Sequence, residues 1–191
     1  MKMYFYYGVM GSSKTATALM KKFNFEENGR KVALIKSYLD MRDGRTLLKS
    51  RIGLASEALT IDLDENIKEK ISNLEKIDII IADEAQFFTE KHIDELRNLT
   101  DSGIMVMCYG LKTDYMGKLF EGSKRLLEIA DVSREIQSMC GCGRKAIINA
   151  RYSNGKIVYS GDQIDLGGNE KYIALCHQCW KMGDIILDKN K

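Results

Sequence analysis

The sequence is short of several features that would place it in a special class of proteins. The longest apolar run that we find, residues 104–109, is far shorter than the roughly 20 residues that a membrane span requires. No charge sign is in excess, because 29 Lys and Arg stand against 27 Asp and Glu, a net charge of +2. Proline is absent altogether, and we attach no function to that. These absences exclude a membrane-spanning protein and argue against a strongly basic nucleic-acid binder.

Nothing at the N-terminus indicates export. The apolar stretch of residues 3–7 is too short for a signal peptide, and no small-residue cleavage site accompanies it. The 191 residues are 45% hydrophobic and 29% charged, which is typical of a globular protein. A chain of this length buries about 70% of its unfolded surface when it folds, enough for a core of its own. We therefore expect a cytoplasmic protein with one domain of ordinary size and at most a small appendage.

Apolar segments alternate with helical patterns through the first two thirds of the chain. Buried strands are predicted at residues 3–7, 32–35, 77–82, 104–109 and 132–136, and helices at residues 14–28, 63–74, 89–99 and 123–130. The face of the first helix is predicted from Ala16, Leu19, Met20 and Phe23, and Thr89 is expected to cap the third helix. Residues 40–55 lack a clear period and are interpreted as a long functional loop. The alternation predicts an α/β fold, with a parallel sheet covered by helices on both faces.

The pattern changes near residue 138. Two short alternating segments, 145–152 and 156–160, are joined by Asn154-Gly155, a strong hairpin signal. A loop with Gly167-Gly168 and a charged terminal helix are expected after them. We therefore predict an α/β domain over residues 1–138 and a small cysteine-bearing lobe over residues 139–191.

A short loop of small residues follows the first strand and leads into the first helix. It consists of Gly8, Val9, Met10, Gly11, Ser12 and Ser13, followed by Lys14 and Thr15. Backbone N–H groups at a helix N-terminus bind anions, a lysine adds a positive charge, and a threonine hydroxyl suits Mg²⁺. The pattern predicts a phosphate-binding loop, with a plain strand-to-helix turn as the alternative. Ser13 departs from it because a glycine is expected just before the lysine.

A pair of carboxylates, Asp83 and Glu84, ends the apolar strand of residues 77–82. Ligands of open parallel sheets bind at the carboxyl ends of the strands. Asp83 is interpreted as a Mg²⁺ partner, and Glu84 as a general base that accepts the proton of an attacking hydroxyl. The alternative is that the pair only solvates a strand end or caps the next helix.

Four of the five cysteines form two close pairs in the last third of the chain, Cys140 with Cys142 and Cys176 with Cys179. Brought together by a hairpin, they make a closed tetrahedral thiolate site, which is typical of structural Zn²⁺. Disulfides are the alternative and are rare in a reducing compartment. Catalytic cysteine chemistry would need a basic partner, for which the sequence offers only two histidines. We predict a zinc ion that holds together a lobe too small to have a core of its own.

Aromatic side chains gather near the predicted carboxylate pair. They are Phe87, Tyr115, Phe120 and Tyr172, each expected in or beside a loop. Such side chains at the edge of a phosphate site suit the stacking of a planar base, although any one of them alone is interpreted as core packing.

The order of these motifs resembles the type II thymidine kinases, a phosphate-loop family with a zinc-bearing lasso. Matching blocks cover nearly the whole chain: residues 4–15, Asp-x-Arg at 40–42, residues 50–54, Asp-Glu-Ala-Gln-Phe at 83–87, Tyr-Gly-Leu-Lys-Thr-Asp-Tyr at 109–115, residues 140–146 and residues 167–176. The resemblance implies a RecA-like phosphate-loop sheet and transfer of the ATP γ-phosphoryl group to the 5′-hydroxyl of thymidine or deoxyuridine, in nucleotide salvage for DNA synthesis. It also implies a homotetramer inhibited by thymidine triphosphate, with no nucleic-acid or membrane partner.

Site residues are carried over from the resemblance position by position. Glu84 matches the catalytic base. ATP is expected at residues Gly8, Val9, Met10, Gly11, Ser12, Ser13, Lys14, Thr15, Asp83 and Gln86, and the nucleoside at residues Met10, Arg51, Phe87, Leu111, Tyr115, Phe120, Gly168 and Tyr172. Arg42 or Arg51 is expected to neutralise the migrating phosphoryl group. Zinc is expected on Cys140, Cys142, Cys176 and Cys179.

Three positions depart from the family pattern. Ser13 replaces glycine, Tyr115 stands where phenylalanine is usual, and Asp165 lies in a lasso stretch that is usually apolar. Because of Ser13, the alternative function is a nucleotide-binding regulator that keeps the fold with weakened catalysis. A zinc-ribbon nucleic-acid module is a further alternative, which the net charge of +2 disfavours.

Overall fold

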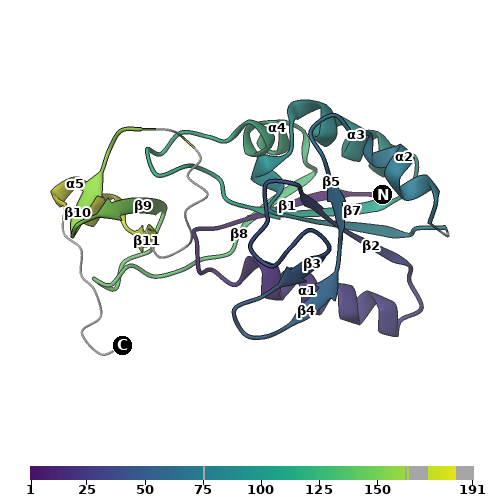
Figure 1. Ribbon diagram of the computed structural model, residues 1–191, viewed down its shortest axis with the longest axis horizontal. Helices are drawn as coiled ribbons and strands as arrows, with labels where there is room; N and C mark the ends of the chain where they lie inside the picture. Colours follow the sequence, from purple (N-terminus) through teal and green to yellow (C-terminus); the bar gives the residue numbers. More distant parts are fainter. Residues whose placement is uncertain (75, 162, 164–171, 184–191) are drawn as a thin grey trace.

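The computed structural model describes residues 1–74, 76–161, 163 and 172–183, and Figure 1 shows two parts lying side by side. The larger part contains β1 (Met3–Tyr7), α1 (Lys14–Glu27), β2 (Val32–Ser37), β3 (Leu47–Lys49), β4 (Ala55–Glu57), β5 (Leu59–Ile61), α2 (Ile67–Ser72), β6 (Ile79–Asp83), the 3-10 helix η1 (Ala85–Phe87), α3 (Glu90–Asp101), β7 (Met105–Gly110), α4 (Glu121–Ile129) and β8 (Val132–Glu135). The smaller part contains β9 (Ile148–Ser153), β10 (Lys156–Val158), β11 (Tyr172–Leu175) and α5 (His177–Met182).

The larger part is built on a six-stranded sheet in the order β5-β2-β6-β7-β1-β8, with every neighbouring pair parallel. Helix α1 and the β3–β4 hairpin lie on one face, and α2, α3 and α4 on the other (Figure 1). The predicted parallel sheet with helices on both faces is thus confirmed. Since all six strands run the same way, their carboxyl ends meet at one edge, where the loops can converge on a ligand.

The central strands read as continuous apolar runs because both sides of the sheet are covered. In β6, Ile80 and Ala82 pack into the core under α2, α3 and α4, whereas Ile79 and Ile81 pack into the core under α1. The period of two in a strand sends neighbouring side chains to opposite faces. Two cores therefore sandwich the sheet and fix the position of its carboxyl-terminal edge.

The predicted N-cap of α3 is confirmed. The Thr89 hydroxyl accepts a hydrogen bond from the His92 backbone N–H at 3.2 Å, while the His92 ring accepts one from the Thr89 N–H at 3.4 Å. Such a capping box satisfies two donors that a helix start leaves unpaired. The cap sets where α3 begins, directly after the η1 turn that follows Glu84.

Residues 40–55 are less irregular than predicted. They include β3 and the start of β4, which pair as an antiparallel hairpin and lead into β5, the edge strand beside β2. These strands have only three residues each, so they are too short to show a period of two in the sequence. Residues 40–46 remain a loop, as predicted.

Two predictions about helices were wrong in part. On α1, Ala16 and Leu19 are buried as expected, but Met20 and Phe23 are 48% and 61% exposed, because the hairpin and sheet contact only part of the helix. Helix α2 is shorter than the predicted 63–74, since Asn66 caps it and Leu63 lies exposed before it. None of the described helices is long and apolar enough to cross a membrane.

The smaller part is a three-stranded antiparallel sheet in the order β10-β9-β11, with α5 beside it. The hairpin predicted at Asn154-Gly155 is confirmed by the β9–β10 pair. Strand β11 was not predicted, and the predicted Gly167-Gly168 loop lies outside the described residues. The core of this part is small and includes Cys140, Cys176 and Cys179, together with Val9 of the larger part.

Candidate active site

The loop after β1 is tightly turned and leaves little space beside its backbone. A side chain at Gly8 is sterically excluded, because a Cβ there would lie 2.4 Å from the Ile136 carbonyl oxygen. Gly11 and Ser13 both have left-handed backbone angles, with φ of 78° and 62°. For serine this conformation costs about 1–2 kcal/mol. The sequence expectation of a glycine-like position before the lysine is therefore met in conformation, although the residue is serine.

The side chain of Lys14 is folded back under this loop. Its ammonium donates to the carbonyl oxygens of Val9 at 2.8 Å and Gly8 at 3.1 Å. Burial lowers the pKa of Lys14 to about 8, and the nearby carboxylates of Glu84 and Asp83 only partly offset that effect. The loop thus surrounds a buried lysine at the start of α1 that loses its charge at mildly alkaline pH.

Asp83 lies at the end of β6, next to the start of α1. Its Oδ2 accepts a hydrogen bond from the Thr15 hydroxyl at 2.7 Å, and the side chain is almost fully buried. Burial and then the charge of Glu84 raise the pKa of Asp83 above its ordinary value. Two hard oxygen atoms, a hydroxyl and a carboxylate, therefore meet beside Lys14, and this donor set suits Mg²⁺.

Glu84 is held in a single orientation by two partners. The Gln86 amide donates to its Oε2 at 2.6 Å, and the Arg42 guanidinium contacts its Oε1. The Glu84 backbone is left-handed, with φ of 49°, a conformation that is strained for glutamate, and strained residues of this kind cluster at functional sites. Gln86 is fixed in turn by the Leu111 N–H, which donates to its Oε1 at 2.9 Å. The carboxylate is thus positioned before any ligand arrives.

Arg42 joins two carboxylates. Its Nε donates to Asp40 Oδ1 at 2.7 Å, and its other end contacts Glu84. Burial alone would lower the pKa of Arg42, but the charges of Glu84 and Asp40 outweigh it, so the pKa is raised and the guanidinium stays charged. The second predicted arginine, Arg51, lies over the phosphate loop, with its NH1 3.7 Å from where a Cβ of Gly11 would be. Both arginines therefore reach the same edge of the sheet.

Of the predicted aromatic residues, Phe87 and Phe120 pack edge to face with ring centroids 5.8 Å apart. Tyr115 is buried, its hydroxyl has no hydrogen-bond partner among the described residues, and the Arg151 guanidinium lies 5.5 Å from its ring centroid. Tyr172 pairs with Arg151 in the β11–β9 register. The structure thus gathers these residues into two groups, one after β6 and one beside β9, whereas Gly168 lies outside the described residues.

Two residues at the site were missed by the sequence reasoning. Asn149 on β9 is buried, its Oδ1 accepts from the Met10 N–H at 2.7 Å, and its Nδ2 donates to the Thr113 carbonyl at 3.2 Å. Lys36, at the end of β2, is fully buried under residues 40–47. Asn149 lies inside a segment that alternates like an ordinary strand, so nothing in the sequence pointed to its role. The lone charge at the end of an apolar strand was a signal for Lys36 that went unused.

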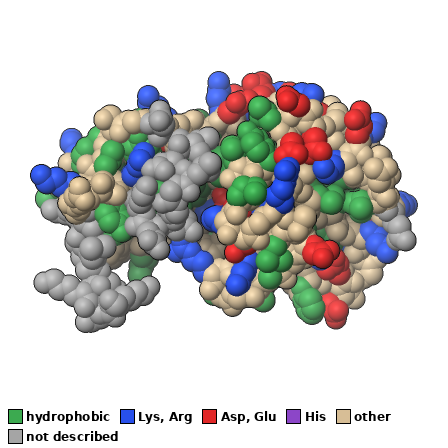
Figure 2. All heavy atoms as spheres, in the orientation of Figure 1, with side chains coloured by type: hydrophobic (Ala, Val, Ile, Leu, Met, Phe, Trp, Pro, Cys, Tyr) green, Lys and Arg blue, Asp and Glu red, His purple; other side chains and the backbone are tan. Residues whose placement is uncertain are grey.

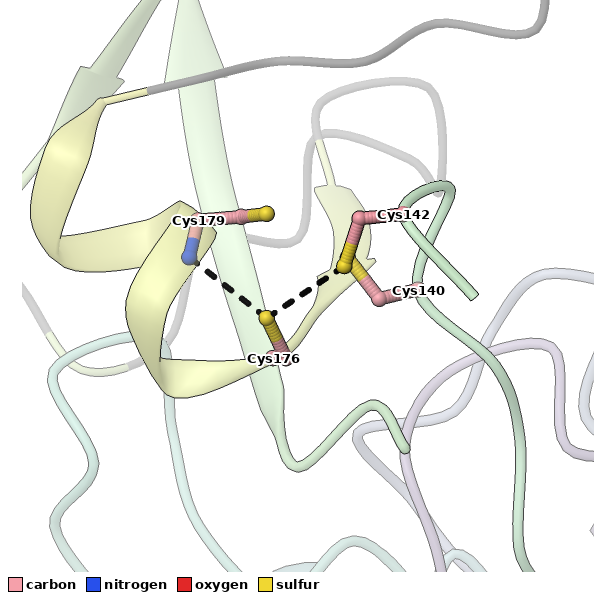
Figure 3. A group of neighbouring side chains, drawn as sticks. All are labelled: Cys140, Cys142, Cys176 and Cys179. Carbon is pink, nitrogen blue, oxygen red and sulfur yellow. Dashed lines mark hydrogen bonds between the residues drawn. The ribbon is translucent and has the colours of Figure 1, made fainter. Parts of the chain in front are cut away.

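The four predicted metal ligands converge, as Figure 3 shows. The sulfur atoms of Cys140, Cys142, Cys176 and Cys179 all lie within 4.8 Å of one another, and none is in a disulfide. The Cys142 and Cys176 sulfurs are 3.7 Å apart. Tetrahedral zinc with Zn–S bonds of about 2.3 Å places its ligands about 3.8 Å apart. The cluster therefore fits a four-coordinate zinc ion.

A parallel sheet with a lysine-bearing loop after its first strand and a buried carboxylate at the end of a neighbouring strand is typical of phosphate-loop phosphotransferases. Comparison with known proteins narrows this class. Residues 1–180 match the family described as Thymidine kinase. The chain belongs to the thymidine kinase family.

Similar proteins match over nearly their whole length. The chain is 43% identical to a thymidine kinase of Streptococcus gordonii over 187 residues, covering 96% of this chain and 98% of that protein. It is 42% identical to a thymidine kinase of Agrobacterium fabrum, covering 94% and 95%. Among solved structures, domain III of the Thermotoga maritima replication initiation protein DnaA has a TM-score of 0.38 and 18% identity, covering 70% and 53%.

Proposed function

We propose that this protein transfers the γ-phosphoryl group of ATP to the 5′-hydroxyl of thymidine and of deoxyuridine, in nucleotide salvage for DNA synthesis. The observation that carries the proposal is the Glu84 carboxylate, held by Arg42 and Gln86 beside the loop of Lys14 in a chain of the thymidine kinase family. The regulator alternative has no support in the comparisons, because the similar proteins are named thymidine kinases.

The phosphate loop is the proposed site of ATP. Its backbone N–H groups and the start of α1 face an anion, and Lys14 can exchange its carbonyl partners for phosphate oxygens. Thr15 and Asp83 would hold Mg²⁺, which supplies positive charge to the phosphate oxygens when it is bound. Arg42 and Arg51 add charge at the same edge. Phosphoryl transfer needs mainly such positioning and charge stabilisation.

Glu84 is the proposed general base. Its strained backbone aims the carboxylate, and two fixed hydrogen-bond donors hold it, so the base needs little reorganisation when a hydroxyl approaches. In a loose phosphoryl-transfer transition state the proton of the attacking hydroxyl is accepted late, so the position of the base matters more than its strength. The 5′-hydroxyl is thus deprotonated as it attacks phosphorus.

The nucleoside is proposed to lie between the η1 turn and the smaller part. Phe87, Phe120 and Leu111 would pack one side of the base, and Met10, Tyr115, Gly168 and Tyr172 the other. Zinc on the four cysteines would hold β9, β11 and α5 together and so carry the lasso that leads to Tyr172. This proposal includes the predicted boundary near residue 138 between the α/β domain and the smaller lobe.

The remaining proposals follow the family resemblance. The active form would be a homotetramer that thymidine triphosphate inhibits, working in the cytoplasm, where thiols stay reduced. Exposed Met20 and Phe23 on α1 are consistent with a surface that another subunit covers.

A nucleoside panel with ATP and Mg²⁺ tests the activity, and Glu84→Gln tests the base. Thymidine and deoxyuridine should be phosphorylated. The Glu84→Gln protein should bind thymidine with about normal affinity but lose about 10²- to 10⁴-fold in kcat, the range expected for a lost general base. Isothermal titration and steady-state kinetics separate the two effects.

Glu128→Gln is the matched control, because Glu128 lies on the exposed face of α4 and pairs only with Arg125 among the described residues. Its kcat should equal that of the wild type. Near-normal kcat in Glu84→Gln would remove Glu84 from its role. A wild-type protein that binds ATP but phosphorylates no nucleoside would support the regulator instead.

A further inference from the structure

Lys36 is a buried charge that the mechanism above does not use. It lies near the end of β2 (Val32–Ser37), in register with Asp83 on the neighbouring strand β6. Its side chain is fully inaccessible to solvent. An ammonium group inside a protein is costly unless it is paired and fully hydrogen-bonded, so its partners indicate what it stabilises.

The partners of Lys36 all come from residues 40–47, the loop after β2 together with the first residue of β3. The ammonium donates to the backbone carbonyls of Asp40 at 2.9 Å, Gly44 at 2.7 Å and Leu47 at 2.9 Å. An ammonium has three N–H donors, and each therefore has a carbonyl acceptor. Asp40 and Gly44 lie within residues 39–46, which form neither helix nor strand, so their carbonyls lack the partners that regular structure would supply, and Leu47 is the first residue of β3. The loop is wrapped around the Lys36 side chain.

The same loop presents Arg42 to Glu84. The Asp40 carboxylate lies 3.6 Å from the Lys36 ammonium, and it accepts a hydrogen bond from the Nε–H of Arg42 at 2.7 Å. The far end of the Arg42 guanidinium contacts Glu84. The Arg42 side chain is 43% exposed, so packing alone does not fix it. Its orientation depends on Asp40, and the position of Asp40 depends on Lys36.

We propose that Lys36 is a positioning residue for phosphoryl transfer: it shapes the loop of residues 40–47 so that Arg42 meets Glu84 at the reacting edge. The inference rests on the proposed function for its effect on catalysis, whereas its effect on the loop stands by itself. Lys36 contacts no substrate in this role. It acts through Asp40 and Arg42.

The first test needs no activity. Arg42 and Arg45 lie in the loop and are trypsin sites, so a loosened loop should be cleaved faster in the native protein. We expect Lys36→Met to be cut there about tenfold faster than the wild type, since local opening controls proteolysis. Thr100→Val is the control: it removes an equally buried hydroxyl whose hydrogen bond, among the described residues, stays within α3, and cleavage in the loop should not change.

The second test is a double-mutant cycle on kcat. Lys36→Met should lower kcat about tenfold to a hundredfold with the KM of thymidine nearly unchanged, the effect expected when a charged group is misplaced by about 1 Å. In an Arg42→Ala background the same change should lower kcat by less than about twofold, because both act through one group. Thr100→Val should leave kcat unchanged. General loss of stability would not produce this pattern.

If Lys36→Met does not fold, Lys36→Gln, which keeps two N–H donors, replaces it in both tests. Loop cleavage at the wild-type rate, or effects on kcat that multiply independently of Arg42, would overturn the proposal. If the wild type phosphorylates no nucleoside, the proposed function fails, and the trypsin rates still decide whether Lys36 shapes the loop.

Discussion

Ser13 shows how a single backbone angle bears on function. Its φ of 62° is one that glycine adopts freely and serine adopts at a cost of about 1–2 kcal/mol. The side chain is exposed and caps nothing in α1, so nothing at the helix start offsets this cost. The loop nevertheless has the left-handed shape that a glycine would give it, so we expect the serine to affect stability rather than phosphate binding.

Replacing Ser13 by glycine should stabilise the protein and leave its activity nearly unchanged. Relief of the strain, less the greater freedom of glycine in the unfolded chain, gives a gain of about 0.5–1 kcal/mol. This corresponds to a rise in Tm of about 1–4 °C for a chain of this size. Calorimetry and steady-state kinetics measure the two quantities.

Asn154→Gly is the matched control, since Asn154 also has a positive φ, of 49°, but asparagine tolerates that conformation. It should gain less stability than Ser13→Gly. A gain in kcat of more than about tenfold for Ser13→Gly, worth about 1.4 kcal/mol of barrier, would show that serine disables the loop and would favour the regulator.

Lys14 gives the site its pH dependence. Burial disfavours the ammonium more strongly than Glu84 and Asp83 favour it, so the pKa in the free protein is lowered to about 8. Above that pH the side chain loses its charge and its attraction for phosphates. We expect kcat/KM for ATP, which reports the free enzyme, to fall about tenfold per pH unit above pH 8.

At saturating ATP the decline of kcat should begin at higher pH, because bound phosphates favour the charged form of Lys14. The control is Lys14→Arg, whose residual kcat/KM should show no transition near pH 8, since arginine stays protonated. A transition that survives in Lys14→Arg belongs to another group.

At the scale of elements, the smaller sheet and the loop after β1 are joined by direct contacts. Asn149 on β9 holds the Met10 N–H, and Val9 packs in the core that contains Cys140, Cys176 and Cys179. A metal ion on the four cysteines would therefore support both β11, which bears Tyr172, and the part of the smaller sheet that contacts the proposed ATP loop. Loss of the metal should therefore weaken the binding of both proposed substrates.

We expect purified protein to contain about one zinc per chain and to lose its β9–β11 sheet when a strong chelator removes it. Thymidine binding should be lost, and the Kd for ATP should rise about tenfold, as expected when outer contacts of a site are removed. Elemental analysis, circular dichroism and titration with ATP follow these changes.

Cys176→Ser should reproduce the zinc-free state, whereas Cys108→Ala should retain zinc because Cys108 is buried in the main core of the larger part and is not one of the four clustered cysteines. A zinc-free protein that stays folded and active would contradict both the structural metal and its support of the phosphate loop.

At the scale of the whole molecule, charge is distributed unevenly between the two parts. In the sequence, residues 139–191 include eight Lys or Arg and five Asp or Glu, a net charge of +3, whereas residues 1–138 have a net charge of −1. Among the described residues, Figure 2 shows the acidic side chains of this face lying on the larger part. Four thiolates around one Zn²⁺ carry a net charge of about −2, so the basic residues lower the electrostatic cost of such a site.

The oligomeric state is also a property of the whole molecule. Sedimentation velocity should give a species about four times the mass of the 21.7-kDa chain. Exposed Met20 and Phe23, one turn apart on α1, supply apolar area for such association. A monomer at micromolar concentration would contradict the tetramer.

Much of this architecture was present in the sequence by itself. The apolar runs determined β1, β6 and β7, because strands covered on both sides tolerate few polar residues. The chemistry was predicted from the small residues before Lys14, the Asp83-Glu84 pair and the cysteine pairs, and for the site residues this stays a prediction. Short strands such as β3 and β11 were not predicted, because three or four residues are too few to show a period of two.

The tertiary structure alone decided how those groups are held. Only folding brings Arg42, 42 residues away in sequence, to Glu84, and only folding joins Asn149 to Met10 across 139 residues. It also decided that a lysine in a strand is fully buried and satisfied by three loop carbonyls. The physical reason is that hydrogen bonds and burial depend on distance in space, whereas patterns in a sequence report only the local period of each element.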